Sequence, residues 1–334
     1  MCYKYIVLTD THLGWNNNNN FWLDLTEKLF DEIISIYSPM ECHGIIHLGD
    51  WYHDRKLLDI KTYNKSLDII QKLKDNDIPI YIILGNHDMY YKSDMFPHSL
   101  RSLKLFNNVE IIDKIYHIGN DIVLSPWNTI PEVNNDKTYL FSHLEINEFP
   151  MNYTNRTFEG GRINVSDFKH FKQVYSGHFH TPSKIKNVQY IGSAFPMTFN
   201  DLNSQRGFYI FDSKGKMEFF KFTSAPKFIR LTSNDEIKEE DIKDNIVEFI
   251  FLEDFGSVKN DKLVQTLESY NPHKLKINYK IQLDEEDLIV DENEEFKMND
   301  NREVIREYID KKLLPKHINK ETLKKFVEKL EKEK

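Results

Sequence analysis

The first half of the chain alternates short apolar runs of strand length with longer stretches of helical periodicity. The strand-like runs, most of which lead directly into a polar cluster, are residues 5–8, 44–48, 80–84, 138–141 and 174–175. Apolar residues recur at steps of three and four over 21–37 and 59–75, and a third helix is expected near 96–106. Because parallel strands direct their C-terminal ends to one crevice, polar clusters that are far apart in the chain are expected to meet there.

Beyond residue 109 the pattern becomes rich in short strands. They are expected at 109–112, 121–124, 138–142, 173–175, 187–191, 207–212 and 217–222. β/α units followed by a strand-rich region predict an α/β fold in which two mixed β-sheets face each other, with helices outside.

Pro226 begins a different stretch, in which strand-like residues 228–231, 246–252 and 275–283 surround a helix-like segment at 259–269. The predicted parts of the chain are a large domain (1–225), a small α+β domain (226–283), an acidic linker (284–296) and a helical segment (297–334). The helical segment has two short amphipathic patterns that need a surface to dock on, either a partner or the small domain. The apolar residues predicted to bind a partner are Val304, Ile305, Tyr308, Ile309, Leu323, Phe326, Val327 and Leu330.

A net charge of −9 argues at first against a nucleic-acid partner. Residues 284–295 account for eight of these charges, however, so the rest of the chain is nearly neutral and the charge decides little. No apolar stretch approaches the roughly 20 residues of a membrane span, and the N-terminus has no signal-peptide pattern. Cys2 and Cys42 are too few for a disulfide framework, so a cytoplasmic location is expected.

The polar clusters contain the residue types that bind divalent cations. They are Asp10-Thr-His12, Gly49-Asp50, Gly85-Asn86-His87-Asp88, His143 and Gly177-His178-Phe-His180. Asp50 suits a shared bridge between two ions. Asp10, His12 and His180 would complete one site, and Asn86, His143 and His178 the other. Mixed imidazole, carboxylate and amide ligands favour Mn²⁺, Fe or Zn over Ca²⁺ and Mg²⁺, and the absence of thiolates argues against a structural zinc site.

Each cluster taken alone has a simpler explanation. Gly49-Asp50 is commonly a turn after a strand, and an isolated His143 is more often a core or surface histidine. Trp127 and Phe179 are interpreted as core or site-wall aromatics, and His47 is left unassigned. The presence of all five clusters in one order, each with suitable residue types, favours a two-metal phosphoesterase.

This order, D-x-H, G-D, G-N-H-[DE], H and G-H-x-H over residues 5–180, resembles that of the calcineurin-like metallophosphoesterase superfamily, whose fold is a four-layer sandwich. Within it the chain is similar to SbcD-type nuclease subunits of double-strand-break repair, particularly their phage recombination-endonuclease form. The strings that carry this similarity are Asp10-Thr-His-Leu-Gly14, Gly49-Asp-Trp-Tyr-His53, Gly85-Asn-His-Asp88, Tyr175-Ser-Gly-His-Phe-His180, Tyr190-Ile-Gly-Ser193 and Arg206-Gly-Phe-Tyr-Ile-Phe-Asp212. The resemblance is strong to about residue 222 and weak through the small domain.

The resemblance implies the same two ligand sets, with Asp50 shared by two Mn²⁺ ions. It implies that His87 protonates or stabilises the leaving 3′ oxygen and that His53 is a second catalytic histidine. A satisfied surface histidine is the alternative for His53, because some phage relatives lack it. The implied reaction is two-metal hydrolysis of DNA phosphodiesters in recombination and repair, as a 3′-to-5′ double-strand exonuclease and a single-strand endonuclease.

The implied partners are DNA, which the small domain would also contact, and an SbcC-type coiled-coil ATPase that residues 297–334 would bind. Helices 59–75 and 96–106 would form a homodimer, and hence a heterotetramer with the ATPase, although their apolar residues equally suit an intramolecular core. A phosphatase or small-nucleotide phosphodiesterase is the first rival. It is disfavoured because Gly49-Asp-Trp-Tyr-His-Asp-Arg-Lys56 lacks the Asp-Arg-Gly of protein phosphatases. A non-catalytic scaffold on the same fold is the second rival, disfavoured because no ligand position is lost.

Overall fold

The computed structural model describes residues 3–91, 94–132, 138–151, 157–202, 204–253 and 255–280. These residues belong to one compact unit, Met1–Ile281. The predicted acidic linker, the helical segment 297–334 and all eight predicted partner-binding residues lie outside the described residues.

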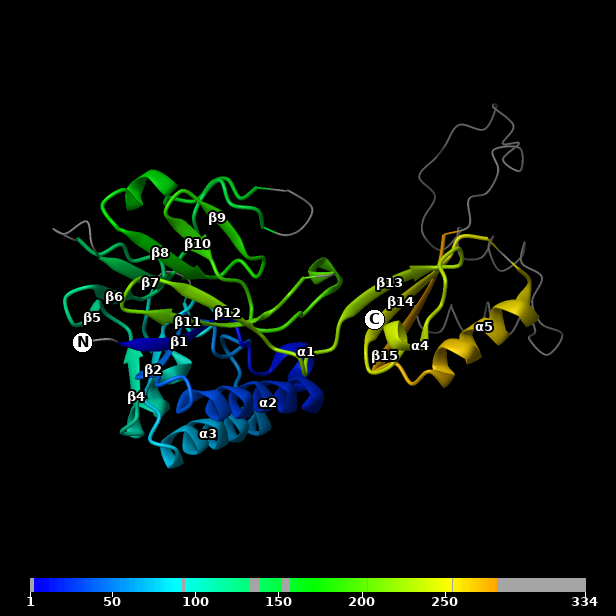
Figure 1. Ribbon diagram of the computed structural model, residues 1–334, viewed down its shortest axis with the longest axis horizontal. Helices are drawn as coiled ribbons and strands as arrows, with labels where there is room; N and C mark the ends of the chain where they lie inside the picture. Colours follow the sequence, from blue (N-terminus) through cyan, green and yellow to red (C-terminus); the bar gives the residue numbers. More distant parts are fainter. Residues whose placement is uncertain are drawn as a thin grey trace, which may run out of the picture. The chain divides into compact units, whose positions relative to one another are not determined.

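The first sheet has six strands in the order β12-β11-β1-β2-β3-β4. Its parallel strands are β1 (Lys4–Leu8), β2 (Gly44–His47), β3 (Ile80–Ile83) and β4 (Val109–Ile112). β11 (Gly207–Asp212) and β12 (Met217–Lys221) extend it antiparallel. The helices α2 (Asn20–Tyr37) and α3 (Ile60–Asp75) lie side by side along this sheet (Figure 1). Side chains alternate along β1, so Ile6 and Leu8 share a core with these helices while Tyr5 and Val7 belong to the core between the sheets.

The second sheet also has six strands, in the order β5-β6-β7-β8-β10-β9. Four of them are parallel: β6 (Ile122–Ser125), β7 (Tyr139–His143), β8 (Gln173–Gly177) and β10 (Val188–Tyr190). β5 (Tyr116–Ile118) and β9 (Ser183–Ile185) are short antiparallel edge strands. Phe141 and Tyr175 pack toward the first sheet, while Leu140 and Val174 pack against Phe168 of the 3₁₀ helix η2 (Val165–Phe168) on the other side. The predicted pair of facing mixed sheets is confirmed.

A third, smaller sheet contains β13 (Phe228–Thr232), β14 (Ile246–Phe251) and β15 (Lys274–Tyr279), all parallel. The helices α4 (Glu239–Ile242) and α5 (Ser257–Ser269) accompany it, and Ile242, Phe249 and Leu267 form part of its own core. The α+β composition expected after Pro226 is therefore observed, while the boundary at residue 226 stays a prediction.

Two local segments differ from a regular α-helix. The helix expected near 96–106 is a 3₁₀ helix, η1 (Ser99–Leu105), whose buried residues Leu100 and Leu103 are three apart and thus fall on one side of a three-residue turn. The asparagine run at residues 16–20 forms the turn α1 (Trp15–Asn18) and the start of α2. Asn16 and Asn17 adopt left-handed backbone angles, which asparagine tolerates, and the Asn19 side chain caps α2 by accepting the Phe21 N–H.

Candidate metal centre

The seven predicted ligands come together where strands of the two large sheets end. Asp10 and His12 follow β1, Asp50 follows β2 and Asn86 follows β3. From the second sheet, His143 ends β7, and His178 and His180 follow β8. Five of the seven side chains are buried, and those of His178 and His180 are 18% and 31% exposed. Neighbouring parallel strands thus deliver loops far apart in sequence to one place.

One group of ligand atoms consists of Asp10 Oδ1, His12 Nε2 and His180 Nε2. The two imidazole nitrogens lie 3.0 Å apart, and they are 3.7 Å (His12) and 3.8 Å (His180) from Asp10 Oδ1. Asp50 Oδ2 lies 3.7 Å from His12 Nε2. These residues match the ligand set predicted for the first ion.

The second group is formed by Asn86 Oδ1, His143 Nε2 and His178 Nδ1. Asn86 Oδ1 is 3.1 Å from each of the two imidazole nitrogens. Asp50 Oδ2 lies 3.3 Å from His143 Nε2, so the same carboxylate oxygen faces both groups. This is the position that a bridging ligand requires.

The hydrogen bonds around the ligands direct lone pairs into the two groups. Asp10 Oδ2 accepts from Thr9 Oγ1 at 2.8 Å and from the His178 N–H at 3.2 Å, whereas the buried Oδ1 has no hydrogen-bond partner. His143 Nδ1–H donates to the Leu48 carbonyl at 2.7 Å, which turns Nε2 toward Asn86 Oδ1. Buried acceptors that face one another need a cation or a proton between them, so these residues fit a pair of divalent ions.

The ionisation of Asp50 and His143 points the same way. Burial alone would lower the pKa of His143, but the Asp50 carboxylate raises it to about 9. Burial alone would raise the pKa of Asp50, and His143 holds it well below its usual value. Without an ion, the Asp50 charge is therefore balanced by a proton on His143, a role that a bound cation would assume.

Backbone geometry lets the loops approach closely. A side chain at Gly49, whose φ is +103°, would place its Cβ 2.5 Å from His143 Nδ1, and one at Gly85 would overlap the backbone N and Oδ1 of Asp50. Four residues with ligand side chains have left-handed backbone angles: Asp10 (φ 52°), His12 (φ 42°), Asp50 (φ 56°) and His178 (φ 95°). Such angles are unfavourable for residues with a Cβ, and they concentrate at functional sites.

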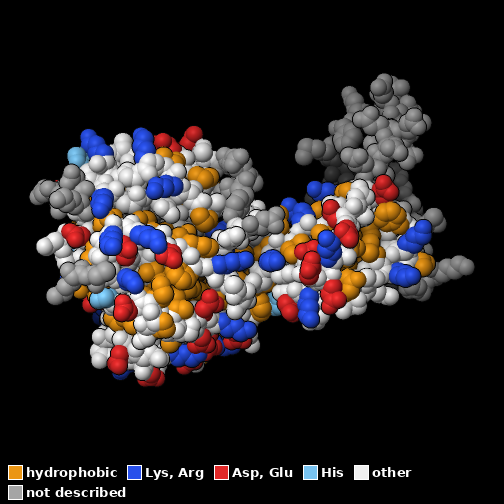
Figure 2. All heavy atoms as spheres, viewed as in Figure 1, with side chains coloured by type: hydrophobic (Ala, Val, Ile, Leu, Met, Phe, Trp, Pro, Cys, Tyr) orange, Lys and Arg blue, Asp and Glu red, His pale blue; other side chains and the backbone are white. Residues whose placement is uncertain are grey.

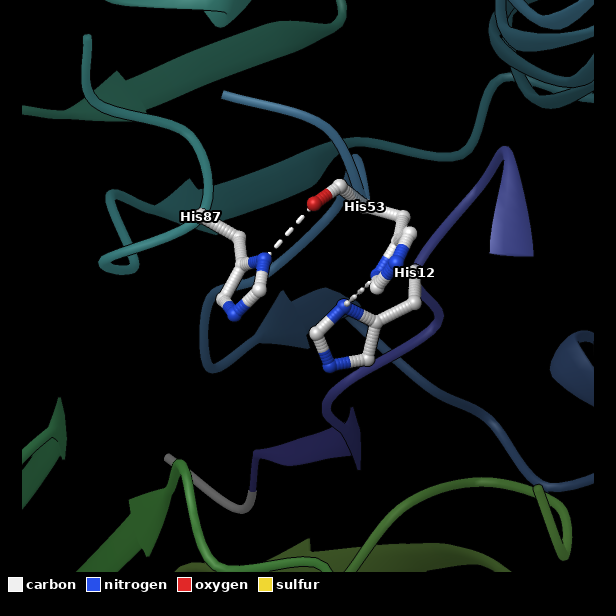
Figure 3. Close-up of side chains that lie close together, drawn as sticks. All are labelled: His12, His53 and His87. Carbon is white, nitrogen blue, oxygen red and sulfur yellow. Dashed lines mark hydrogen bonds between the residues drawn. The ribbon is translucent and has the colours of Figure 1, made fainter. Parts of the chain in front are cut away.

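His53 and His87, the two predicted catalytic residues, lie beside the first group (Figure 3). The His87 N–H donates to Asp50 Oδ1 at 2.8 Å, and its Nδ1–H donates to the His53 carbonyl at 2.6 Å. These bonds leave Nε2 as the ring nitrogen of His87 that can hold or release a proton. His53 is half-buried. Burial lowers the pKa of its imidazole, and the neighbouring His87 lowers it further.

The calcineurin-like phosphoesterase family matches residues 3–182. This chain belongs to that family. It is 33% identical to exonuclease subunit 1 of Enterobacteria phage T4 over 226 residues, which cover 63% of this chain and 65% of that protein. It is 23% identical to the DNA double-strand break repair protein Mre11 of Methanococcus maripaludis over 251 residues, 64% of each chain. The chain thus spans slightly less than two thirds of these relatives. The structure is also similar to Pseudomonas putida nuclease MPE over 53% of this chain and 61% of that one, at 17% identity and a TM-score of 0.29.

In this calcineurin-like phosphoesterase, sequence reasoning missed two buried side chains that hold the ligand loops. The Asp88 carboxylate accepts the backbone N–H groups of Trp51 (3.4 Å), Tyr52 (3.0 Å) and Gly85 (3.1 Å), and so connects the loops after β2 and β3. Burial and the charge of Asp50 raise the pKa of Asp88 to about 7. The acidic residue at the fourth position of the Gly-Asn-His-Asp motif was the available signal.

His47, left unassigned from the sequence, is the second of these residues. Its Nδ1 accepts the Gly49 N–H at 3.3 Å, so Nε2–H donates to Thr11 Oγ1 at 3.0 Å. Burial lowers its pKa to about 3, which keeps the ring neutral. A histidine inside an apolar strand was the only local signal for this contact between the first two ligand loops.

Trp127 forms a wall of the site, as predicted, with its ring centroid 4.9 Å from that of His178. It lines a cavity of about 310 Å³ together with Arg55, Asn86, Asn128, Glu145 and His178. Glu145 Oε1 lies 3.5 Å from His178 Nε2, and this interaction directs the other ring nitrogen toward Asn86. Sequence reasoning gave no role to Glu145.

Proposed function

We propose that this chain is a Mn²⁺-dependent DNA nuclease that hydrolyses phosphodiesters with two bridged cations. One observation carries the proposal: Asp50 Oδ2 lies between His12 Nε2, at 3.7 Å, and His143 Nε2, at 3.3 Å. The relatives support DNA as the substrate, because those named above are an exonuclease subunit and a double-strand break repair protein. The mixed nitrogen and oxygen ligands are compatible with Mn²⁺, as they are with Fe or Zn.

The surface charge is compatible with a locally bound polyanion. On the face drawn in Figure 2, Lys and Arg side chains are interspersed with Asp and Glu, and no single basic band dominates the described residues visible there. When bound, two divalent cations supply positive charge and Lewis acidity at a phosphate. Arg55, which lines the cavity beside His178, would add one further positive charge there.

The chain's own catalytic group would be His87. Its N–H bond to Asp50 and its Nδ1–H bond to the His53 carbonyl fix the ring beside the bridge. A proton on Nε2 would pass to the departing 3′ oxygen, which is a poor leaving group without one. The buried ligands, in contrast, would hold the ions without exchanging protons.

The direct test is hydrolysis by the purified chain with Mn²⁺ and, separately, with EDTA. Linear duplex DNA and circular single-stranded DNA report exonuclease and endonuclease cleavage, and p-nitrophenyl phosphate and bis(p-nitrophenyl) phosphate report monoester and diester hydrolysis. We expect Mn²⁺-dependent cleavage of DNA and of the diester, both abolished in Asp50→Ala. Monoester hydrolysis without DNA cleavage would instead indicate a phosphatase, and no hydrolysis of any substrate would favour a scaffold.

We further propose that the chain forms a homodimer through residues that follow the second and third ligand loops. Leu57 and Ile60 are 77% and 76% exposed, and Tyr91 and Phe96 are 52% and 57% exposed. Leu57 lines one cavity with Tyr90 and Pro97, the sequence neighbours of Tyr91 and Phe96. Large apolar side chains gathered at the surface are typical of an interaction site. Ile60→Glu is compatible with the first turn of α3, so it should produce monomers in analytical ultracentrifugation without unfolding the helix. Val258→Glu, at an equally exposed position of α5, should leave the oligomeric state unchanged.

The predicted helical segment 297–334 remains a proposed binding site for a coiled-coil ATPase of the SbcC type. The T4 relative is named a subunit, which supports the existence of a partner. Deletion of 297–334 should leave Mn²⁺-dependent cleavage intact and abolish co-purification with the ATPase. Co-purification of the truncated chain would refute this assignment.

A further inference from the structure

Three histidines from three different loops form a chain of hydrogen bonds beside the first ligand group (Figure 3). His53 Nδ1 lies 3.4 Å from His12 Nδ1, and the His53 carbonyl accepts His87 Nδ1–H at 2.6 Å. Residue 53 therefore contacts one predicted ligand through its ring and the predicted proton donor through its backbone. No such link was anticipated from the sequence.

The position of the protons follows from the ligand atoms. His12 Nε2 faces Asp10, Asp50 and His180, so it is the nitrogen that would bind a cation. A neutral imidazole that binds through Nε2 carries its proton on Nδ1. His53 Nδ1 lies within reach of that proton, and to accept it His53 must keep a lone pair on Nδ1 and its own proton on Nε2.

The surroundings of His53 hold the ring in this orientation. The Trp15 ring lies 4.7 Å from it, edge-on at 77°, and the His87 ring stacks on it at 5.4 Å and 18°. The three histidines offer nitrogen atoms within 4.8 Å of one another, which would also suit an ion. However, His12 and His87 both direct a proton toward His53, so hydrogen bonding accounts for the group without a third ion.

We propose that His53 is a positioning residue, which orients His12 by accepting its Nδ1–H and orients His87 through its carbonyl, and transfers no proton itself. This assignment differs from that of a second catalytic histidine. It rests on the proposed function only in requiring that a cation binds at His12. Loss of the His53 ring should therefore weaken ion binding before it affects the chemical step.

The test compares Mn²⁺ titration calorimetry with bis(p-nitrophenyl) phosphate turnover in His53→Ala and His53→Asn. The Asn oxygen occupies nearly the position of His Nδ1 and can accept from His12, but it cannot transfer a proton. We expect His53→Ala to weaken one of two Mn²⁺ binding events about 10- to 100-fold, as loss of an outer hydrogen-bond partner typically does. His53→Asn should recover most of that affinity, and its turnover at saturating Mn²⁺ should approach the wild-type value. His117→Ala, an exposed histidine in β5, is the matched control.

Two results would overturn the proposal. Wild-type Mn²⁺ affinity in both variants, with turnover lost in both at saturating Mn²⁺, would make His53 catalytic. Equal weakening in Asn and Ala variants that retain the wild-type circular dichroism spectrum would show that the accepted hydrogen bond is not the cause. Mn²⁺ titration needs no DNA, so a wild-type protein that binds two ions without cleaving DNA would contradict the proposed function alone.

Discussion

Gly85→Ala is the sharpest test of how closely the second and third ligand loops pack. A Cβ at Gly85 would overlap the backbone N and Oδ1 of Asp50, and the backbone of Gly85 is outside the left-handed region, so the effect would be steric. Overpacking costs about 1–3 kcal/mol, and loss of the 2.8 Å bond from the His87 N–H to the Asp50 carboxylate costs about 1.5–3 kcal/mol. Alanine also reduces the conformational freedom of the unfolded chain, which stabilises the folded state by about 0.4–1 kcal/mol. The expected net destabilisation is roughly 2–5 kcal/mol.

Gly119→Ala provides the control. Gly119 has a φ of +60°, and a Cβ there would meet nothing within 4 Å. Its cost is limited to left-handed backbone strain of about 1–2 kcal/mol, again offset by about 0.4–1 kcal/mol from the unfolded chain. Urea unfolding followed by circular dichroism, without added metal, would compare the two variants with the wild type.

Mn²⁺ calorimetry adds a second readout, because displacement of the Asp50 carboxylate should weaken both ions. Gly119→Ala should bind Mn²⁺ like the wild type. If Gly85→Ala unfolded at the same urea concentration as Gly119→Ala and bound two Mn²⁺ ions normally, the close contact between these loops would be wrong, and with it the position of the bridge.

Further predictions concern the proton donor, a buried ion pair and a thiol. His87→Asn should reduce DNA turnover about 10²- to 10⁴-fold with unchanged Mn²⁺ affinity. Turnover of bis(p-nitrophenyl) phosphate should decrease far less, because p-nitrophenolate leaves without a proton. Equal losses on both substrates would contradict a proton-donor role. Asp201→Ala leaves the buried Arg206 guanidinium without its carboxylate and should lower the free energy of unfolding, measured in urea, by about 3–5 kcal/mol. Asp167→Ala, in a similar capping box without an arginine, should lower it by about 1 kcal/mol. Burial raises the pKa of the Cys42 thiol to about 11. In a Cys2→Ser protein at pH 8, iodoacetamide should therefore alkylate Cys42 roughly 100-fold more slowly than in the urea-unfolded chain, and the rate should increase as the pH rises. A rate equal to that of the unfolded chain would show an exposed thiolate.

The elements that could be predicted from the sequence are those whose signal is local. An apolar run that stops at a polar cluster marks both a buried strand and its functional end, as β1 before Asp10 and β3 before Asn86 illustrate. The three-residue strands β5 and β9 were missed, because edge strands of this length leave no periodicity to detect. The helix predicted near 96–106 is present, but the sequence did not determine its type, since two leucines three residues apart suit an α-helix and a 3₁₀ helix alike.

The residues that support the ligands were not predictable in the same way, because their partners lie elsewhere in the chain. Asp88 binds backbone groups of the loop after β2, His47 binds Thr11 after β1, and Glu145 faces His178 after β8. The spacing of residues along the sequence does not predict these contacts, because the partners are brought together by the register between strands and by turns of the backbone. The candidate ligands are therefore visible in the sequence, whereas the orientation of each side chain is a property of the folded chain.

The orientation matters because the ligand groups are unfavourable on their own. Asp10 Oδ1 is buried without a hydrogen bond, and the facing nitrogens of His12 and His180 lie 3.0 Å apart. Left-handed backbone at four ligand positions adds strain that packing elsewhere must offset. Binding of a cation would give Asp10 Oδ1 a partner, and an ion present at 100 times its dissociation constant would stabilise the fold by about 2.7 kcal/mol. The buried supports thus hold these side chains in place, so ion affinity and folding stability depend on the same contacts.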